Sequence, residues 1–89
     1  MSQANRPNNQ IMSKVSKEIV TVSIPKGELE NDYTFFEDGK IRHNYDQSVY
    51  KLDLETWLNV RQISDAEKQK ILQACPPAFK TRVAAILKG

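Results

Sequence analysis

The chain has 89 residues, of which 39% are hydrophobic and 27% charged, and its formal net charge is +2. This length allows one domain, and it excludes a two-domain enzyme, a dinucleotide-binding Rossmann pair and a TIM barrel. The small total charge hides three segments: residues 1–17 carry +3, residues 18–60 carry −5 and residues 61–89 carry +4. Such segregation suits complementary charges, either between two halves of one fold or across a self-association interface.

The polar N-terminal segment differs in composition from the rest of the chain. Residues 1–17 are rich in Asn, Ser and Gln, and we expect them to form a disordered polar tail. Residues 18–89 should form a single small α+β domain, with a β part over 18–52 and a helical part over 53–89. A core of this size is marginal. Dimerisation or partner binding would therefore be a natural way to bury more surface.

The β part contains two strong strand signals. Residues 18–24 alternate between two faces, with Val20, Val22 and Ile24 on one of them, which predicts a strand. Asp38-Gly39 stands between two β-prone, aromatic-rich runs over 32–45, which predicts a tight hairpin. A further short strand over 49–52 is expected after a turn. Together these segments predict an antiparallel meander of two to four strands.

The period of the apolar residues changes after residue 52. Leu54, Trp57 and Leu58 have the i, i+3, i+4 spacing of a helix behind Asp53, a candidate N-cap, so we expect a short helix to about Arg61. This interpretation places the single tryptophan in the core as its largest anchor.

Two further helices follow. Ser64 and Glu67 have the spacing of a capping box, which predicts the start of a helix. Pro76-Pro77 must end it, because proline has no backbone N–H to donate, and Pro77 suits the first position of the next helix. Strands followed by helices favour the α+β class, here a small antiparallel β-meander or hairpin with two or three short helices packed on one sheet face. The expected core consists of the inward apolar positions: Val20, Val22, Ile24, Phe36, Ile41, Leu54, Trp57, Leu58, Ile71, Leu72, Phe79, Val83, Ile86 and Leu87.

The hairpin is the first candidate interaction surface. A two-residue turn at Asp38-Gly39 would bring Tyr33, Phe35 and Arg42 to one face, as a platform for a partner or for stacking single-stranded bases. The alternative is that one face packs on the helices and the other holds ordinary cross-strand pairs. A three-residue loop with a glycine bulge would shift the register and dissolve the platform.

The basic helical pair is the second candidate. Lys80 and Arg82 lie near the start of the last helix, where they would contact nucleic acid if the pair worked as a helix-turn-helix-like element. An acidic protein partner fits the same residues. Basic residues on outer helix faces also serve solubility, so this pattern does not define a site by itself.

No constellation for catalysis, cofactor binding or metal binding is visible. Cys75 lies at a helix C-terminus, where the negative end of the dipole disfavours a thiolate, and a buried structural thiol is expected. His43 is the only histidine, which leaves no histidine-rich metal site. An enzyme would need a carboxylate with a perturbed pKa beside His43, and the paired acids stand near turns, where water keeps their pKa ordinary.

These observations favour a small non-enzymatic protein-interaction or regulatory module that binds a protein partner or forms a homodimer. The alternative is a nucleic-acid-binding accessory protein that uses the basic helical pair over 61–89. No apolar run is long enough to cross a membrane, and we expect no membrane partner. One cysteine and no secretory signal favour the cytoplasm. The candidate interaction residues are Tyr33, Phe35, Arg42, Lys80 and Arg82.

Overall fold

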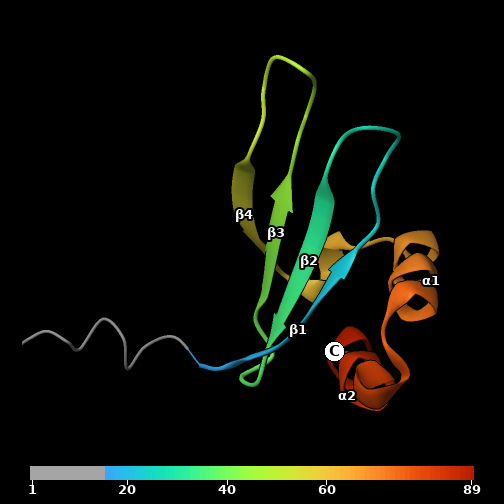
Figure 1. Ribbon diagram of the computed structural model, residues 1–89. Helices are drawn as coiled ribbons and strands as arrows, with labels where there is room; N and C mark the ends of the chain where they lie inside the picture. Colours follow the sequence, from blue (N-terminus) through green and yellow to red (C-terminus); the bar gives the residue numbers. More distant parts are fainter. Residues whose placement is uncertain (1–15) are drawn as a thin grey trace, which may run out of the picture.

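The computed structural model describes residues 16–89 (Figure 1). Its elements are, in chain order, β1 (Glu18–Ser23), β2 (Asn31–Phe36), β3 (Ile41–Tyr45), β4 (Leu54–Leu58), the 3-10 helix η2 (Val60–Gln62), α1 (Asp65–Ala74) and α2 (Pro77–Leu87). The strands form one antiparallel sheet in the order β1-β2-β3-β4. Both α-helices lie on the same side of this sheet (Figure 1). The predicted α+β meander with helices on one sheet face is therefore confirmed.

The turn between β2 and β3 differs from the expected two-residue turn. Phe36 N donates to Lys40 O over 3.0 Å, and Gly39 N donates to Phe36 O over 2.9 Å, which closes a three-residue loop over 37–39. Gly39 has a φ of 90°, a left-handed conformation that glycine adopts without a Cβ clash. The register consequently pairs Phe35 with Ile41 and Thr34 with Arg42. The two-residue prediction is wrong, and the bulged alternative is correct.

Residues 54–58 form a strand, so the predicted helix from Asp53 to about Arg61 is wrong. Leu54 and Leu58 satisfy the spacing of a helix, but with Thr56 they also alternate as a strand does. The free edge of β3 decides between the two conformations, because it supplies backbone partners along the whole of β4. Asp53 has a φ of 57° and therefore does not act as an N-cap. The β part thus extends to Leu58 instead of ending at residue 52.

The expected short strand over 49–52 is also absent from the observed sheet. Ser48 and Lys51 face each other across a turn, with Lys51 N donating to Ser48 O over 3.0 Å. The segment is the tip of the β3–β4 connection, which extends beyond the helices at one end of the sheet (Figure 1). Its apolar residues do not reach the core.

The two helices begin and end where the sequence predicts. Ser64 Oγ accepts a hydrogen bond from Glu67 N over 3.1 Å, which caps α1. Pro76 separates the helices and Pro77 is the first residue of α2. In a complete capping box the Glu67 carboxylate would also accept from the Ser64 backbone N–H. Here it turns toward the sheet and accepts from Tyr33 Oη instead.

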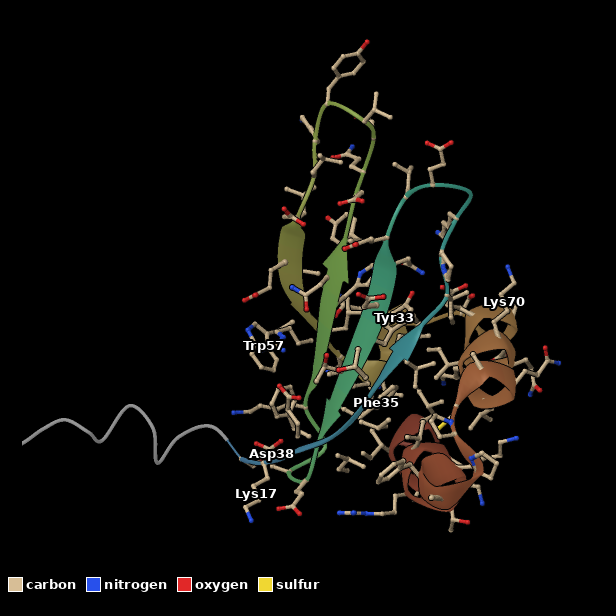
Figure 2. The ribbon with its side chains drawn as sticks, in the orientation of Figure 1. Lys17, Tyr33, Phe35, Asp38, Trp57 and Lys70 are labelled. Carbon is tan, nitrogen blue, oxygen red and sulfur yellow. The ribbon has the colours of Figure 1, made fainter. Side chains whose placement is uncertain are left out.

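The core lies between the sheet and the helices. Tyr33 and Phe35 are 5% and 0% exposed, and Figure 2 shows both between β2 and the helical layer. Trp57 is 47% exposed on the side of the sheet away from the helices, so its predicted core position is wrong (Figure 2). The buried core residues are Val22, Tyr33, Phe35, Ile41, Ile63, Ile71, Cys75, Val83 and Leu87.

The predicted disordered tail over 1–17 falls mostly outside the described residues, which begin at Ser16. Ser16 and Lys17 belong to the fold. Glu37 N donates to Lys17 O over 2.9 Å, and Asp38 N donates to Ser16 Oγ over 3.1 Å. These two residues thus extend β1 along the β2–β3 turn, and the fold begins earlier than residue 18.

Candidate functional site

The hairpin platform predicted from Tyr33, Phe35 and Arg42 does not exist as one surface. In the observed register Tyr33 and Phe35 face the helices, whereas Arg42 pairs with Thr34 and faces the opposite side. A shift of one residue moves every side chain of a strand to the other face. The three-residue loop therefore puts both aromatic rings in the core and leaves Arg42 outside it.

The other two predicted residues also separate. Arg82 Nη2 lies 3.6 Å from Glu37 Oε2, so this guanidinium points toward the β2–β3 turn. Lys80 lines a shallow hollow on the outer side of α2, together with Lys88. A neighbouring hollow between α1 and α2 is lined by Lys68 and again by Lys88. The basic residues that share a surface are thus Lys68, Lys80 and Lys88.

A partly buried polar network joins the sheet to α1. Tyr33 Oη donates to Glu67 Oε2 over 2.7 Å, and Asn31 Nδ2 donates to the same oxygen over 3.4 Å. Asn31 Nδ2 also donates to Ile24 O over 3.2 Å, which leaves its Oδ1 to accept from His43 Nε2 over 2.6 Å. Because Oδ1 has no proton, this geometry puts the imidazole proton on Nε2. Every polar group of the buried Asn31 side chain therefore has a partner.

The same contacts change the acidity of the network. Burial raises the pKa of the Tyr33 hydroxyl, and the bond to the Glu67 carboxylate raises it further. Burial also raises the pKa of Glu67, but hydrogen bonds from Tyr33 and Asn31 outweigh it and the pKa is lower than usual. The pKa of His43 is lowered by burial and by the positive charge of Lys26. At neutral pH the network contains a carboxylate, a neutral phenol and a neutral imidazole.

His43 lies between two tyrosine rings. Its centroid is 4.5 Å from that of Tyr33 and 4.5 Å from that of Tyr45, with interplanar angles of 4° and 14°. Stacking and the bond to Asn31 fix the ring orientation. The nearest carboxylate in this network, that of Glu67, is reached only through Asn31. His43 therefore helps to hold β2, β3 and α1 together.

Two further groups have structural roles. The Cys75 thiol is buried, as predicted, and burial raises its pKa, which disfavours the reactive thiolate. Glu30, Asp46 and Asp53 bring carboxylate oxygens within 4.8 Å of one another. Asp46 uses both of its oxygens on backbone groups, accepting from Glu30 N and from Asp53 N over 2.9 Å each. This carboxylate joins the β1–β2 loop to the β3–β4 loop.

The side of the sheet away from the helices, here called the open face, has its own aromatic cluster. The Phe36 and Trp57 ring centroids lie 5.3 Å apart. The Arg42 guanidinium carbon lies 5.4 Å from the Phe36 centroid and 6.0 Å from the Trp57 centroid, within the range of cation–π attraction. Phe36 is buried by this arrangement, whereas Trp57 keeps half of its surface accessible.

The exposed large hydrophobic residues of the described chain all lie in one segment. Val49, Tyr50, Leu52 and Trp57 are 66%, 92%, 54% and 47% exposed. All belong to the β3–β4 loop or to β4. The sequence analysis missed this surface because it assigned Trp57 to a core helix. The signal that would have found it is the alternation of Leu54, Thr56 and Leu58, which places Trp57 on the opposite face.

No family model, curated protein or solved structure matches this chain. Among residues 16–89, neither helix has the length and apolar character needed to span a bilayer.

Proposed function

We propose that this protein is a small non-enzymatic protein-interaction module that binds its partner through β4 and the loop before it. The observation that supports this proposal is the gathering of exposed Val49, Tyr50, Leu52 and Trp57 in one segment. Exposed apolar side chains concentrated in one part of a fold are typical of an interface, and Tyr and Trp are enriched among the residues that dominate binding. The loop part of this segment is further suited to binding because it projects beyond the end of the sheet (Figure 1).

The rigidity of this surface supports the same proposal. Asp46 anchors both ends of the β3–β4 loop through its bonds to Glu30 N and Asp53 N. The Arg42 guanidinium carbon lies over the Trp57 ring, 6.0 Å from its centroid. A surface that is already ordered loses less conformational entropy on binding.

We place the protein in the cytoplasm, where a single thiol remains reduced, and cell fractionation tests this assignment.

Site-specific photo-crosslinking tests the proposed surface. A benzoylphenylalanine at position 50 should form a covalent adduct with a protein in cells, because this side chain is 92% exposed at the tip of the β3–β4 loop. The matched control carries the same group at Gln73, an exposed position on α1. Mass spectrometry identifies the adducts. Equal yields at the two positions, or no adduct at position 50, would overturn the proposal.

A second candidate is nucleic-acid binding by the helical pair. It is favoured by the shared surface of Lys68, Lys80 and Lys88, and opposed by the ion pair that turns Arg82 toward Glu37. Binding of this kind should fall steeply with salt. In a low-salt gel shift, Lys80→Glu with Lys88→Glu should abolish it, whereas Lys51→Glu at the distant loop should not. Absence of any shift would eliminate this candidate.

A further inference from the structure

β4 is an outer edge of the sheet among the described residues, and its hydrogen-bonding pattern follows from the rest of the meander. The bonds from Phe36 N to Lys40 O and from Asp46 N to Glu30 O show which residue pairs between β2 and β3 are hydrogen-bonded pairs and which are non-bonded pairs. In an antiparallel ladder neighbouring residues bond to opposite sides. The bonded β3–β4 pairs are therefore 41 with 58, 43 with 56 and 45 with 54. It follows that the backbone groups of Glu55 and Trp57 point away from the sheet.

The two edges of the sheet are protected to different degrees. β1 has an irregular register between Glu18 and Val20, and α1 lies against it. β4 has an unbroken register over its five residues and contains no proline or lysine, and its one charged side chain is that of Glu55. Natural edge strands usually contain such residues or a bulge, because an exposed regular edge pairs with other strands. β4 thus has the features of a strand that pairs with another.

We propose that β4 pairs with β4 of a second copy of this chain, antiparallel and about a two-fold axis at Thr56. This inference rests on the proposed function and names its partner. Glu55 of each copy then exchanges both backbone hydrogen bonds with Trp57 of the other, and Thr56 faces its own counterpart as a non-bonded pair. The two four-stranded sheets become one continuous sheet.

The side chains of β4 are complementary to themselves in this register. On the helix side, Leu54 faces Leu58 of the second copy and Thr56 faces Thr56, which are favourable cross-strand pairs. On the open face, the Glu55 carboxylate approaches Trp57 of the second copy, beside which Arg42 already lies. Arg42 is engaged by Glu18 of its own sheet over 3.4 Å, so the pairing places Glu55 opposite an aromatic ring and brings no like charges to face each other.

Other two-fold registers are less favourable. An axis at Glu55 would place two carboxylates directly opposite each other, which is destabilising. An axis at Trp57 would leave Leu54 without a partner in the opposing strand. The axis at Thr56 is the one that pairs all residues of β4.

The same pairing accounts for the exposed loop. The loop over 46–53 precedes β4 and η2 follows it. Antiparallel pairing therefore brings the loop of each copy to the η2 end of the other. Val49, Tyr50 and Leu52 then gain a surface on which to pack, and the small core gains buried area that one copy does not supply.

A cysteine at position 56 tests this geometry directly. Non-bonded antiparallel pairs have Cα atoms about 4.5 Å apart, within the range of about 4.4–6.8 Å that disulfides span. With oxidised glutathione, Thr56→Cys should form a disulfide-linked dimer as the glutathione is reduced to two thiols. Thr21→Cys, at an exposed position on the opposite edge strand, is the matched control and should remain monomeric. The wild-type chain, with buried Cys75, gives the background.

Two other variants separate loss of pairing from loss of folding. Glu55→Pro removes an outward N–H but no bond to β3, and Thr56→Lys places two ammonium groups together at the axis. Sedimentation should show a dimer for the wild type and a roughly tenfold or larger rise in the dimer Kd for each variant, with unchanged circular dichroism. A wild-type monomer, or Thr56→Cys that does not cross-link, overturns the pairing. An adduct of position 50 with a different protein would then preserve the proposed function, whereas absence of any adduct would overturn both.

Discussion

At the scale of single residues, Glu67 connects local and tertiary structure. Its backbone N–H completes the cap of α1 through Ser64, while its carboxylate leaves the helix to accept from Tyr33 and Asn31. The sequence predicts the first role from the capping spacing. The second role depends on the register of β2, which places Tyr33 on the helix side. A buried hydroxyl needs a partner, and this carboxylate supplies it.

Removal of the Tyr33 hydroxyl should measurably destabilise the fold. Tyr33→Phe deletes the donor of a 2.7 Å bond to a carboxylate, and bonds to charged groups contribute about 1.5–3 kcal/mol. We expect the free energy of unfolding to fall by about 2 kcal/mol in urea denaturation. Tyr50→Phe removes a hydroxyl from a fully solvated ring and should leave it unchanged. Equal effects of the two substitutions would contradict the role of the network.

The network also predicts how stability depends on pH. The pKa of His43 in the fold is lower than its ordinary value of 6.5, so the unfolded chain takes up the proton first as pH falls. Stability should therefore be full above pH 6.5 and decline below it. The pKa of Glu67 is lower than 4.5, which should add a second decline below that pH. Urea midpoints measured from pH 8 to pH 4 test this, and His43→Gln should remove the first decline. A constant midpoint across this range would refute the prediction.

At the scale of elements, β4 shows how tertiary context decides an ambiguous segment. Five residues with apolar positions 54, 57 and 58 are compatible with a helix, and with Thr56 included they are compatible with a strand. Short helices are marginal in water, whereas a strand beside β3 satisfies its backbone groups immediately. α1 and α2 are longer and have clear start and stop signals, and both were predicted correctly.

The cap of α1 gives a test at this scale. Ser64→Ala removes the oxygen that accepts from Glu67 N, and loss of an N-cap costs about 1 kcal/mol. We expect thermal and urea unfolding to show a loss of that size, together with weaker amide-exchange protection in the first turn of α1. Ser23→Ala on the exposed side of β1 is the control and should have little effect. A larger loss in the control variant would argue against the cap.

At the scale of the whole molecule, the segregated charges make one contact between the two halves. Among the ion pairs of the described residues, Arg82 with Glu37 joins the basic helical half to the acidic β half. The groups in this pair are about half exposed, so it contributes little to stability. The two layers are held mainly by apolar packing around Phe35, Ile71 and Val83, all of which are fully buried.

The central core position should be the most sensitive one. Ile71 is 0% exposed between the layers, and truncation of a buried isoleucine to alanine costs about 2–5 kcal/mol. Because a domain of this size has a small stability margin, Ile71→Ala should leave much of the protein unfolded at 37 °C. Gln73→Ala, at an exposed position of α1, should change the unfolding free energy by less than about 0.5 kcal/mol. Circular dichroism and differential scanning calorimetry would measure the stability of both variants.

Local sequence patterns predict the strand at the start of the fold, the presence of the hairpin, the limits of both helices and the α+β order. These features depend on alternation, caps and prolines, which act between near neighbours. The hairpin register, the strand at Leu54–Leu58 and the exposure of Trp57 depend instead on contacts between elements. A one-residue change in the length of the β2–β3 loop moves every side chain of β3 to the other face of the sheet. A short apolar segment such as 54–58 becomes a strand when a neighbouring strand offers hydrogen-bond partners to its backbone. The surface proposed for binding follows from those contacts, which no local pattern encodes.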